Sequence, residues 1–191
     1  MKNLNLILEV VLLSASIASA SSILTYTESV VGSGSFNGTA FSGQTVTISE
    51  TANTSGIALF GGGVYDLPGT VSVNVPGIGT GTFTDSMFVF SNQNAADGGF
   101  FDSTRGINLA FNDNAAFATY ALATAIGPLS GTSFVDTTDT YATTLGNFSF
   151  SSAASTATFT AAGSAVPEPG TMGLLGIGLA AVVAGRRLLA R

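Results

Sequence analysis

Hydrophobic and polar residues alternate in short stretches along the chain between residues 22 and 163. Four stretches place apolar side chains on one face and small polar side chains on the other: residues 45–49 (TVTIS), 71–75 (VSVNV), 107–111 (INLAF) and 157–160 (ATFT). A period of two is typical of β-strands with one buried face. Together with the spacing of the turn residues, the pattern predicts eight to twelve strands across this region.

Two further stretches refine this prediction. Residues 35–41 (SFNGTAF) place Asn37 and Gly38 between strand-like residues, and this pair is typical of a two-residue hairpin turn. Residues 87–90 (MFVF) form a continuous apolar run, which predicts a strand covered on both faces.

Composition agrees with an all-β fold. Only 8% of the residues are charged and 46% are hydrophobic, whereas helical surfaces normally carry more Lys, Glu and Arg. The recurring turns favour a β-sandwich of jelly-roll type, because an open solenoid would need a repeat and the strand spacings show no fixed period. The phenylalanines are expected to fill the core between the sheets, and the alternative is an aromatic platform for sugars.

The region between residues 21 and 165 is strongly acidic. It carries nine Asp and Glu residues against one basic residue, Arg105, which gives a net charge of −8. Such a surface would repel phosphate backbones, so nucleic-acid binding is not expected. The chain has no histidine and no cysteine, and its only lysine is Lys2. These absences exclude Ser-His catalysis, disulfides and thiolate metal sites.

Oxygen donors and glycines cluster in two stretches, residues 92–102 (NQNAADGGFFD) and 112–114 (NDN). Asp97, Asp102 and Asp113 are therefore candidate ligands for a calcium ion, since hard cations prefer oxygen. The spacing matches no EF-hand, and solvated turns rich in Asp and Asn explain the same residues. No other cofactor is expected.

A hydrolase that uses two carboxylates is a further alternative, with Asp97 and Asp102 or Asp136 and Asp139 as the pair. Nine scattered acids produce such pairs easily, and the aromatic and basic residues that usually position a sugar do not accompany them. We therefore expect that the protein is not an enzyme.

The N-terminus has the features of a signal peptide. Lys2 provides a positive charge, an apolar run follows, and Ala18 and Ala20 satisfy the small-x-small rule for signal peptidase. The expected signal peptide is residues 1–20, which the Sec translocon would export and signal peptidase would remove. Glu9 interrupts the apolar run, and the alternative is an N-terminal core strand.

The C-terminus ends in an apolar segment followed by basic residues. Residues 171–185 carry no charge, and Arg186 and Arg187 come directly after them. As a helix the segment would span about 22 Å, which makes a short transmembrane anchor with the arginines in the cytoplasm. A buried C-terminal helix is the alternative, although the preceding Pro-Glu-Pro and the basic end do not favour it.

The order of these C-terminal parts resembles a known sorting signal. Val166, Pro167, Glu168 and Pro169, then the apolar segment, then Arg186 and Arg187, resemble the PEP-CTERM signal of Gram-negative bacteria that produce exopolysaccharide. The resemblance implies that exosortase, a membrane enzyme, recognises residues 166–191 and processes the protein near Pro-Glu-Pro. Residues 21–165 would then be the exported passenger domain.

These observations lead to one expected function. The protein would pass through an inner-membrane anchored intermediate to the cell surface or the extracellular matrix of a Gram-negative bacterium. There it would play a structural or adhesive role and contact extracellular polysaccharide, directly or through Ca²⁺. Two alternatives stay open: a binding module for glycan or ice, and the carboxylate-dependent glycoside hydrolase.

Overall fold

The computed structural model describes residues 22–163. They form an all-β fold, as predicted, with antiparallel strands, two short 3₁₀-helices and no α-helix within this range. The strands are β1 (Ile23–Phe36), β2 (Thr39–Asn53), β3 (Ala58–Gly61), β4 (Val64–Gly69), β5 (Val71–Val75), β6 (Gly79–Thr82), β7 (Met87–Asn92), β8 (Asp97–Asp102), β9 (Ile107–Asp113), β10 (Ile126–Val135), β11 (Tyr141–Ala142) and β12 (Asn147–Gly163). The 3₁₀-helices are η1 (Thr54–Gly56) and η2 (Ala115–Thr119).

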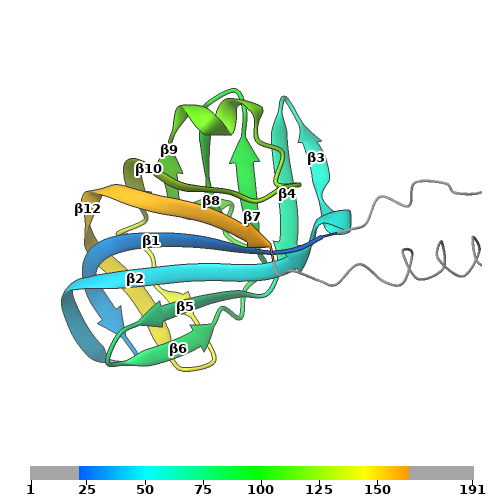
Figure 1. Ribbon diagram of the computed structural model, residues 1–191. Coiled ribbons are helices and arrows are strands. Elements are labelled where there is room, and N and C mark those ends of the chain that lie inside the picture. The colour runs from blue at the N-terminus through cyan, green and yellow to red at the C-terminus, as the bar shows by residue number, and fades with distance from the viewer. Residues whose placement is uncertain (1–21, 164–191) are drawn as a thin grey trace, which may run out of the picture.

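All twelve strands belong to one sheet, in the order β3-β4-β7-β8-β9-β10-β12-β1-β2-β5-β6, with β11 beside β12. The predicted jelly-roll sandwich of two separate sheets is therefore wrong in its topology. The physical reason is that β1, β2 and β12, with 14 to 17 residues each, continue their pairing through the bend of the fold. In Figure 1 these long strands run across the direction of β4, β7 and β8.

The bend in β1 coincides with glycines. The pairing of β1 with β12 shifts register between Val30 and Gly32 and again between Ser33 and Gly34. A Cβ atom on Gly34 would lie 2.0 Å from the carbonyl oxygen of Ser149, so only glycine allows this close approach of the two strands. Bulges of this kind increase local twist, which lets one sheet fold over its own core.

The core lies between the two halves of the folded sheet. The hydroxyl of Tyr26 on β1 donates a hydrogen bond to the carbonyl oxygen of Leu122 at 2.6 Å. The amide of Val89 on β7 donates to the carboxylate of Glu50 on β2 at 3.1 Å. The first contact joins β1 to the segment before β10, and the second joins two strands that are far apart in the sheet order, so the inner faces of both halves enclose one hydrophobic core.

At the other edge of the sheet, β6 is connected back to β12 through the segment around β11. A bridge between Phe83 and Thr143 joins the end of β6 to the segment that follows β11, and β11 itself pairs with β12. Aromatic rings fill the space inside: Phe148 contacts the rings of Phe36 at 5.7 Å and Phe83 at 6.2 Å, both edge to face. This packing stabilises the end of the fold where β1 and β2 turn.

The predicted strands and the hairpin turn are confirmed. Residues 45–49, 71–75, 107–111 and 157–160 all lie within strands. Asn37 and Gly38 connect β1 to β2 with φ values of 51° and 74°, and Phe36 pairs directly with Thr39. Two positive φ values in a two-residue loop match the twist of the flanking strands.

The predicted signal peptide and sorting segment lie outside the described residues. The predicted site residues there are Ala18, Ala20, Val166, Pro167, Glu168, Pro169, Arg186 and Arg187. The predicted transmembrane segment, residues 171–185, also lies outside. Among residues 22–163, no helix has both the length and the apolar character needed to cross a membrane.

Candidate functional site

The outer face of β7 carries aromatic residues. Met87 and Val89 pack into the core, so the alternation of the strand places Phe88 and Phe90 on the opposite face. The prediction that residues 87–90 are covered on both faces is confirmed for Phe90, which is 6% exposed, but not for Phe88, which is half-buried.

Cross-strand pairing extends this aromatic surface over β8, β9 and β10. Phe88 lies opposite Phe101 with the rings stacked at 4.9 Å, and Phe111 lies opposite Phe134 with the rings stacked at 4.7 Å. Eight of the fourteen phenylalanines pack in the core, as expected. The other six do not: Phe60, Phe88, Phe90, Phe101, Phe111 and Phe134. We refer to the outer surface of β4 and β7–β10, with Phe60 of β3, as the aromatic face.

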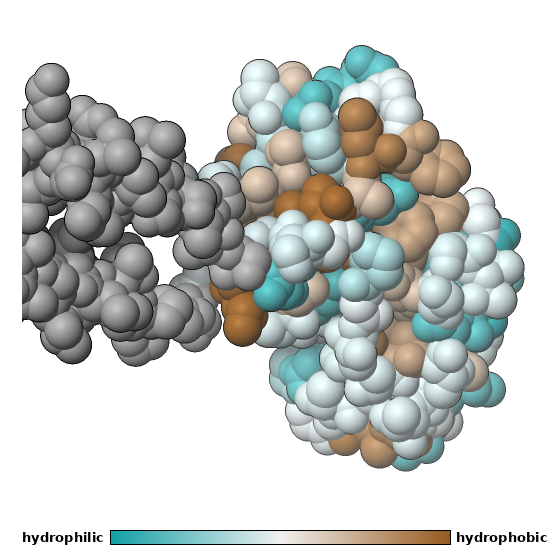
Figure 2. All heavy atoms as spheres, turned by 90° about the vertical axis from the view of Figure 1, so that its right-hand side faces the viewer, coloured by the Kyte–Doolittle hydropathy of each residue, from teal (hydrophilic) through white to brown (hydrophobic). Residues whose placement is uncertain are grey.

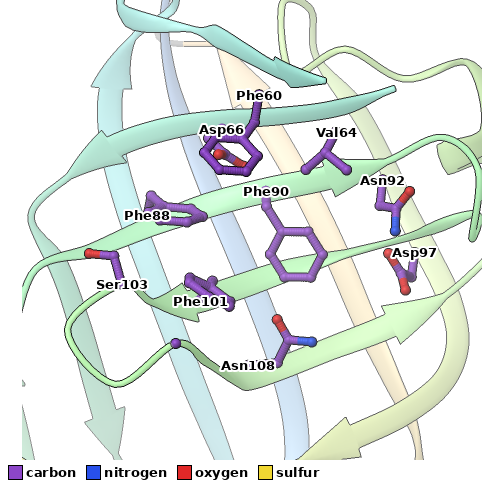
Figure 3. Close-up of a pocket in the computed structure, with 11 residues that line it drawn as sticks. Phe60, Val64, Asp66, Phe88, Phe90, Asn92, Asp97, Phe101, Ser103 and Asn108 are labelled. Carbon is purple, nitrogen blue, oxygen red and sulfur yellow. The ribbon is translucent and has the colours of Figure 1, made fainter. Parts of the chain in front are cut away.

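A groove of about 540 Å³ lies on the aromatic face. Its hydrophobic lining comes from Phe60, Phe88, Phe90, Phe101 and Val64. Figure 3 shows these side chains arranged over β4, β7 and β8, with Phe60 above them. Phe60 is 84% exposed, which is unusual for a large apolar side chain. The volume is within the range of roughly 300–1,000 Å³ that is usual for ligand sites.

Gly99 lies buried on β8 between two phenylalanines of the aromatic face. It pairs with Phe90 on one side and Phe111 on the other, and the centres of these two rings are 6.3 Å apart. A Cβ atom at this position would lie 2.2 Å from the carbonyl oxygen of Ala110. The close approach of β8 and β9 therefore requires glycine here.

Polar side chains line the groove together with the rings. Asn92 and Asp97 form a directly opposed pair on β7 and β8 and lie side by side in Figure 3. Asp66 on β4 is opposite Phe90, and Asn108 on β9 is opposite Phe101. Aromatic rings with a few amides and carboxylates are the usual lining of a binding site for an organic molecule with polar groups.

Two of these acids have incomplete hydrogen bonding. One carboxylate oxygen of Asp66 and one of Asp97 are shielded from solvent and receive no hydrogen bond from the described residues. Burial raises the pKa of both carboxyls. The negative charge of Asp113, directly opposite Asp97 on β9, raises the pKa of Asp97 further. Both acids line the groove, so a ligand that donates hydrogen bonds would meet their carboxylates there.

The structure brings together only two of the three predicted calcium ligands. Asp97 and Asp113 face each other across β8 and β9. Asp102 is fully buried at the other end of β8, where Arg105 binds it at 2.6 Å. Among residues 22–163, no three acidic side chains form a group that could hold a metal ion.

The predicted carboxylate pairs also occupy separate surroundings. Asp97 and Asp102 stand at opposite ends of β8, roughly 16 Å apart at about 3.3 Å per residue, which exceeds the separation of about 5–9.5 Å in glycoside hydrolases. Asp136 accepts hydrogen bonds from Thr138, the amide of Asp139 and the hydroxyl of Tyr141. Burial opposes these bonds, but together they lower the pKa of Asp136, as expected for an acid that stabilises a turn.

The outer surface of the other half of the sheet carries hydroxyl groups. Its register forms two rows across β12, β1, β2, β5 and β6: Thr160-Thr27-Ser49-Ser72-Thr82 and Thr158-Ser29-Thr47-Asn74-Thr80. We refer to this surface as the hydroxyl face. Some hydroxyls bond to each other, such as Ser72 with Thr82 at 3.2 Å. Figure 2, which views one side of the molecule, shows a surface of mainly intermediate hydropathy with separate hydrophobic areas.

Two buried acids on the inner face were not identified from the sequence. Glu28 and Glu50 are each 1% exposed. Neither carboxylate oxygen of Glu28 has a hydrogen-bond partner among the described residues, and burial raises its pKa to about 8. Burial raises the pKa of Glu50 to about 7 against the hydrogen bond from Val89. The alternation of residues 23–30 with Tyr26 and Val30 could have placed Glu28 inside.

The sequence also missed the aromatic groove. The alternation of Phe88 and Phe90 with Met87 and Val89 was a signal, because it puts two phenylalanines on one face and the core residues on the other. The contribution of Phe60, which lies on a different hairpin, had no signal in the local pattern.

Comparison with known families finds one match. Residues 165–187 match the PEP-CTERM protein-sorting motif, in agreement with the resemblance inferred from the sequence. No curated protein and no solved structure matches the chain. The motif implies export, a membrane-anchored intermediate and sorting to the surface that depends on exosortase.

Proposed function

We propose that this protein is a structural or adhesive protein of the extracellular matrix, and that it binds polysaccharide through the groove of the aromatic face. The proposed role is attachment, without chemistry on the polysaccharide. The sorting motif at residues 165–187 supports the location, since its substrates are delivered to the surface where such polymers occur. The groove supports the binding role, and its lining of four phenylalanines, with Phe60 84% exposed, is the observation that carries the proposal.

Stacking on aromatic rings explains how the groove would hold a sugar. One face of a pyranose ring presents mainly C–H groups, which pack well against the flat apolar surface of a phenyl ring. Phe60 and Phe101 lie on different strands around the groove and present separate ring surfaces. An exposed apolar surface of this kind is costly in water unless a partner covers it.

The polar residues explain why the ligand would be a sugar instead of a purely apolar molecule. Asp66, Asn92, Asp97 and Asn108 line the groove together with the rings. Their carboxylate and amide groups would form hydrogen bonds with the hydroxyl groups at the edge of a sugar ring. A ligand without hydrogen-bond donors would leave these acceptors unpaired and would bind more weakly.

The hydroxyl face favours a second candidate function, binding of ice. Rows of Ser and Thr across neighbouring strands, about 4.8 Å apart, present regularly spaced hydroxyls to water. The curvature of β1 and β2 works against a flat match to a crystal surface. Measurement of thermal hysteresis tests this function directly, and a value at the level of buffer eliminates it.

The groove is tested by affinity electrophoresis of the full chain in gels that contain neutral polysaccharides such as cellulose derivatives, xylan or glucomannan. We expect retardation in at least one gel and a loss of about tenfold in affinity for Phe60→Ala. Phe134→Ala is the matched control, because Phe134 is 44% exposed on the same face but does not line the groove. Equal retardation of both variants and the wild type would exclude the groove as the binding site.

A further inference from the structure

The groove has an unbalanced negative charge. Asp66 and Asp97 line it, and Asp113 faces Asp97 across the neighbouring strand. None of the described residues that line the groove is basic. Like charges at directly opposed positions of antiparallel strands destabilise each other, so the Asp97–Asp113 pair carries an electrostatic cost.

The single basic residue of the passenger domain does not relieve this cost. Arg105 is the only Lys or Arg among residues 22–163. Its guanidinium binds Asp85 and Asp102 and lies 5.0 Å from the centre of the Tyr141 ring. These contacts are all away from Asp66 and Asp97, so no basic side chain among residues 22–163 neutralises the two groove carboxylates.

The ligand that fits best is a cation that also donates hydrogen bonds. A neutral hydroxyl would donate a hydrogen bond to a groove carboxylate but would leave the repulsion between Asp97 and Asp113 in place. A positive charge beside Asp97 would relieve this repulsion as well. The partial burial of Asp97 would strengthen its attraction to that charge.

The surroundings favour an organic ammonium group over a metal ion. Calcium takes six to eight oxygen ligands, and the described residues contain no group of three acids that could hold a metal. The phenyl rings of the groove suit an organic cation instead, since the faces of aromatic rings attract ammonium groups and its carbon atoms pack against them.

We infer that the groove selects polysaccharides whose sugars carry free amino groups, with Asp66 and Asp97, on strands β4 and β8, as the residues that bind ammonium groups of the polymer. This inference rests on the proposed polysaccharide binding and specifies its substrate class. The phenylalanines would hold the ring of an amino sugar and of its N-acetylated form alike. The two acids would distinguish the two forms, because only the free amine carries a positive charge. Anionic polymers that contain uronic acids are rejected by the same acids.

Isothermal titration calorimetry of the full chain tests the inference with three probes of equal length: glucosamine oligomers, N-acetylglucosamine oligomers and galacturonate oligomers. At pH 6, where the sugar amine is protonated, we expect at least tenfold tighter binding of the glucosamine oligomer than of the acetylated one. No binding of the galacturonate oligomer is expected. Raised salt should weaken only the glucosamine complex, because exposed charges are screened.

Isosteric variants assign the selectivity to the two acids. Asp97→Asn and Asp66→Asn should each reduce affinity for the glucosamine oligomer by about tenfold and leave the acetylated oligomer unchanged. Asp139→Asn removes one charge outside the groove and should change neither. Circular dichroism verifies that each variant is folded, and the salt dependence of the wild type tests the inference even if one variant unfolds.

The possible failures are distinguishable. Equal binding of the amino and acetylated oligomers, with both weakened by Phe60→Ala, overturns the selection by charge and leaves polysaccharide binding intact. Tightest binding of the galacturonate oligomer overturns it as well. An absence of binding to any oligomer or neutral polysaccharide overturns both proposals together.

Discussion

The aromatic face and the hydroxyl face are two outer surfaces of the same sheet, and they differ in almost every chemical respect. The aromatic face carries six phenylalanines, four of which line a groove together with two acids. The hydroxyl face presents rows of Ser and Thr, some of which bond to each other. The strands beneath both faces contribute to one core, so the difference does not come from the demands of folding.

This difference shows where function is expected in the fold. Small hydroxyl side chains keep an outer face soluble, and β-branched Thr also suits the strand backbone. Exposed phenylalanine contributes neither solubility nor much stability to a free monomer. Its concentration on one face therefore indicates a surface that is kept for a partner, and the variants below test that division.

The largest effect should come from replacing, one at a time, two neighbouring phenylalanines on opposite faces of β8 by alanine. Phe100 is fully buried in the core, so Phe100→Ala should lower the free energy of unfolding by about 3–5 kcal/mol. Phe101 lies on the aromatic face, and Phe101→Ala should cost less than about 1.5 kcal/mol while weakening glycan binding. Urea denaturation measures both. Similar losses of stability would show that the aromatic face serves the fold and not a ligand.

The next effect concerns the acids inside the sheet. Burial raises the pKa of Glu28 from 4.5 to about 8, so the folded state binds the proton more tightly than the unfolded chain. Its contribution to stability is therefore fully present below pH 4.5 and is lost as the pH rises towards 8, by on the order of 4 kcal/mol. Glu50, with a pKa of about 7, acts in the same direction.

Glu28→Gln isolates this contribution. The variant cannot ionise, so at pH 8 it should be more stable than the wild type, and the difference should disappear near pH 4.5. Thermal unfolding followed by circular dichroism across this pH range provides the measurement. An identical pH dependence of the two proteins would mean that Glu28 does not titrate in the folded state.

The smallest effect is expected on the hydroxyl face. Thr27 lies in the middle of a row, opposite Thr160 and Ser49, with its side chain half-exposed. Thr27→Ala should change the free energy of unfolding by no more than about 0.5 kcal/mol, because surface substitutions away from special contacts rarely do more. It should also leave binding to every oligomer unchanged. A loss of glycan affinity in this variant would move the binding site to the hydroxyl face.

The sequence by itself determined the class of fold and the local elements. A period of two identified strands such as residues 71–75, and Asn37-Gly38 identified a hairpin, because both signals depend only on neighbouring residues. The sorting motif could also be read directly, since it is a contiguous segment that another protein recognises.

The tertiary structure alone decided the arrangement of the sheet and the composition of the groove. Whether the strands formed one sheet or two depended on pairings such as β1 with β12, which join residues more than a hundred positions apart. The same long-range register brought Asp97 to Asp113 and left Asp102 with Arg105, although all three acids looked equivalent in the chain. Periodicity shows that a strand has two faces, but only packing against the rest of the molecule decides which face is buried and which neighbours share the exposed one.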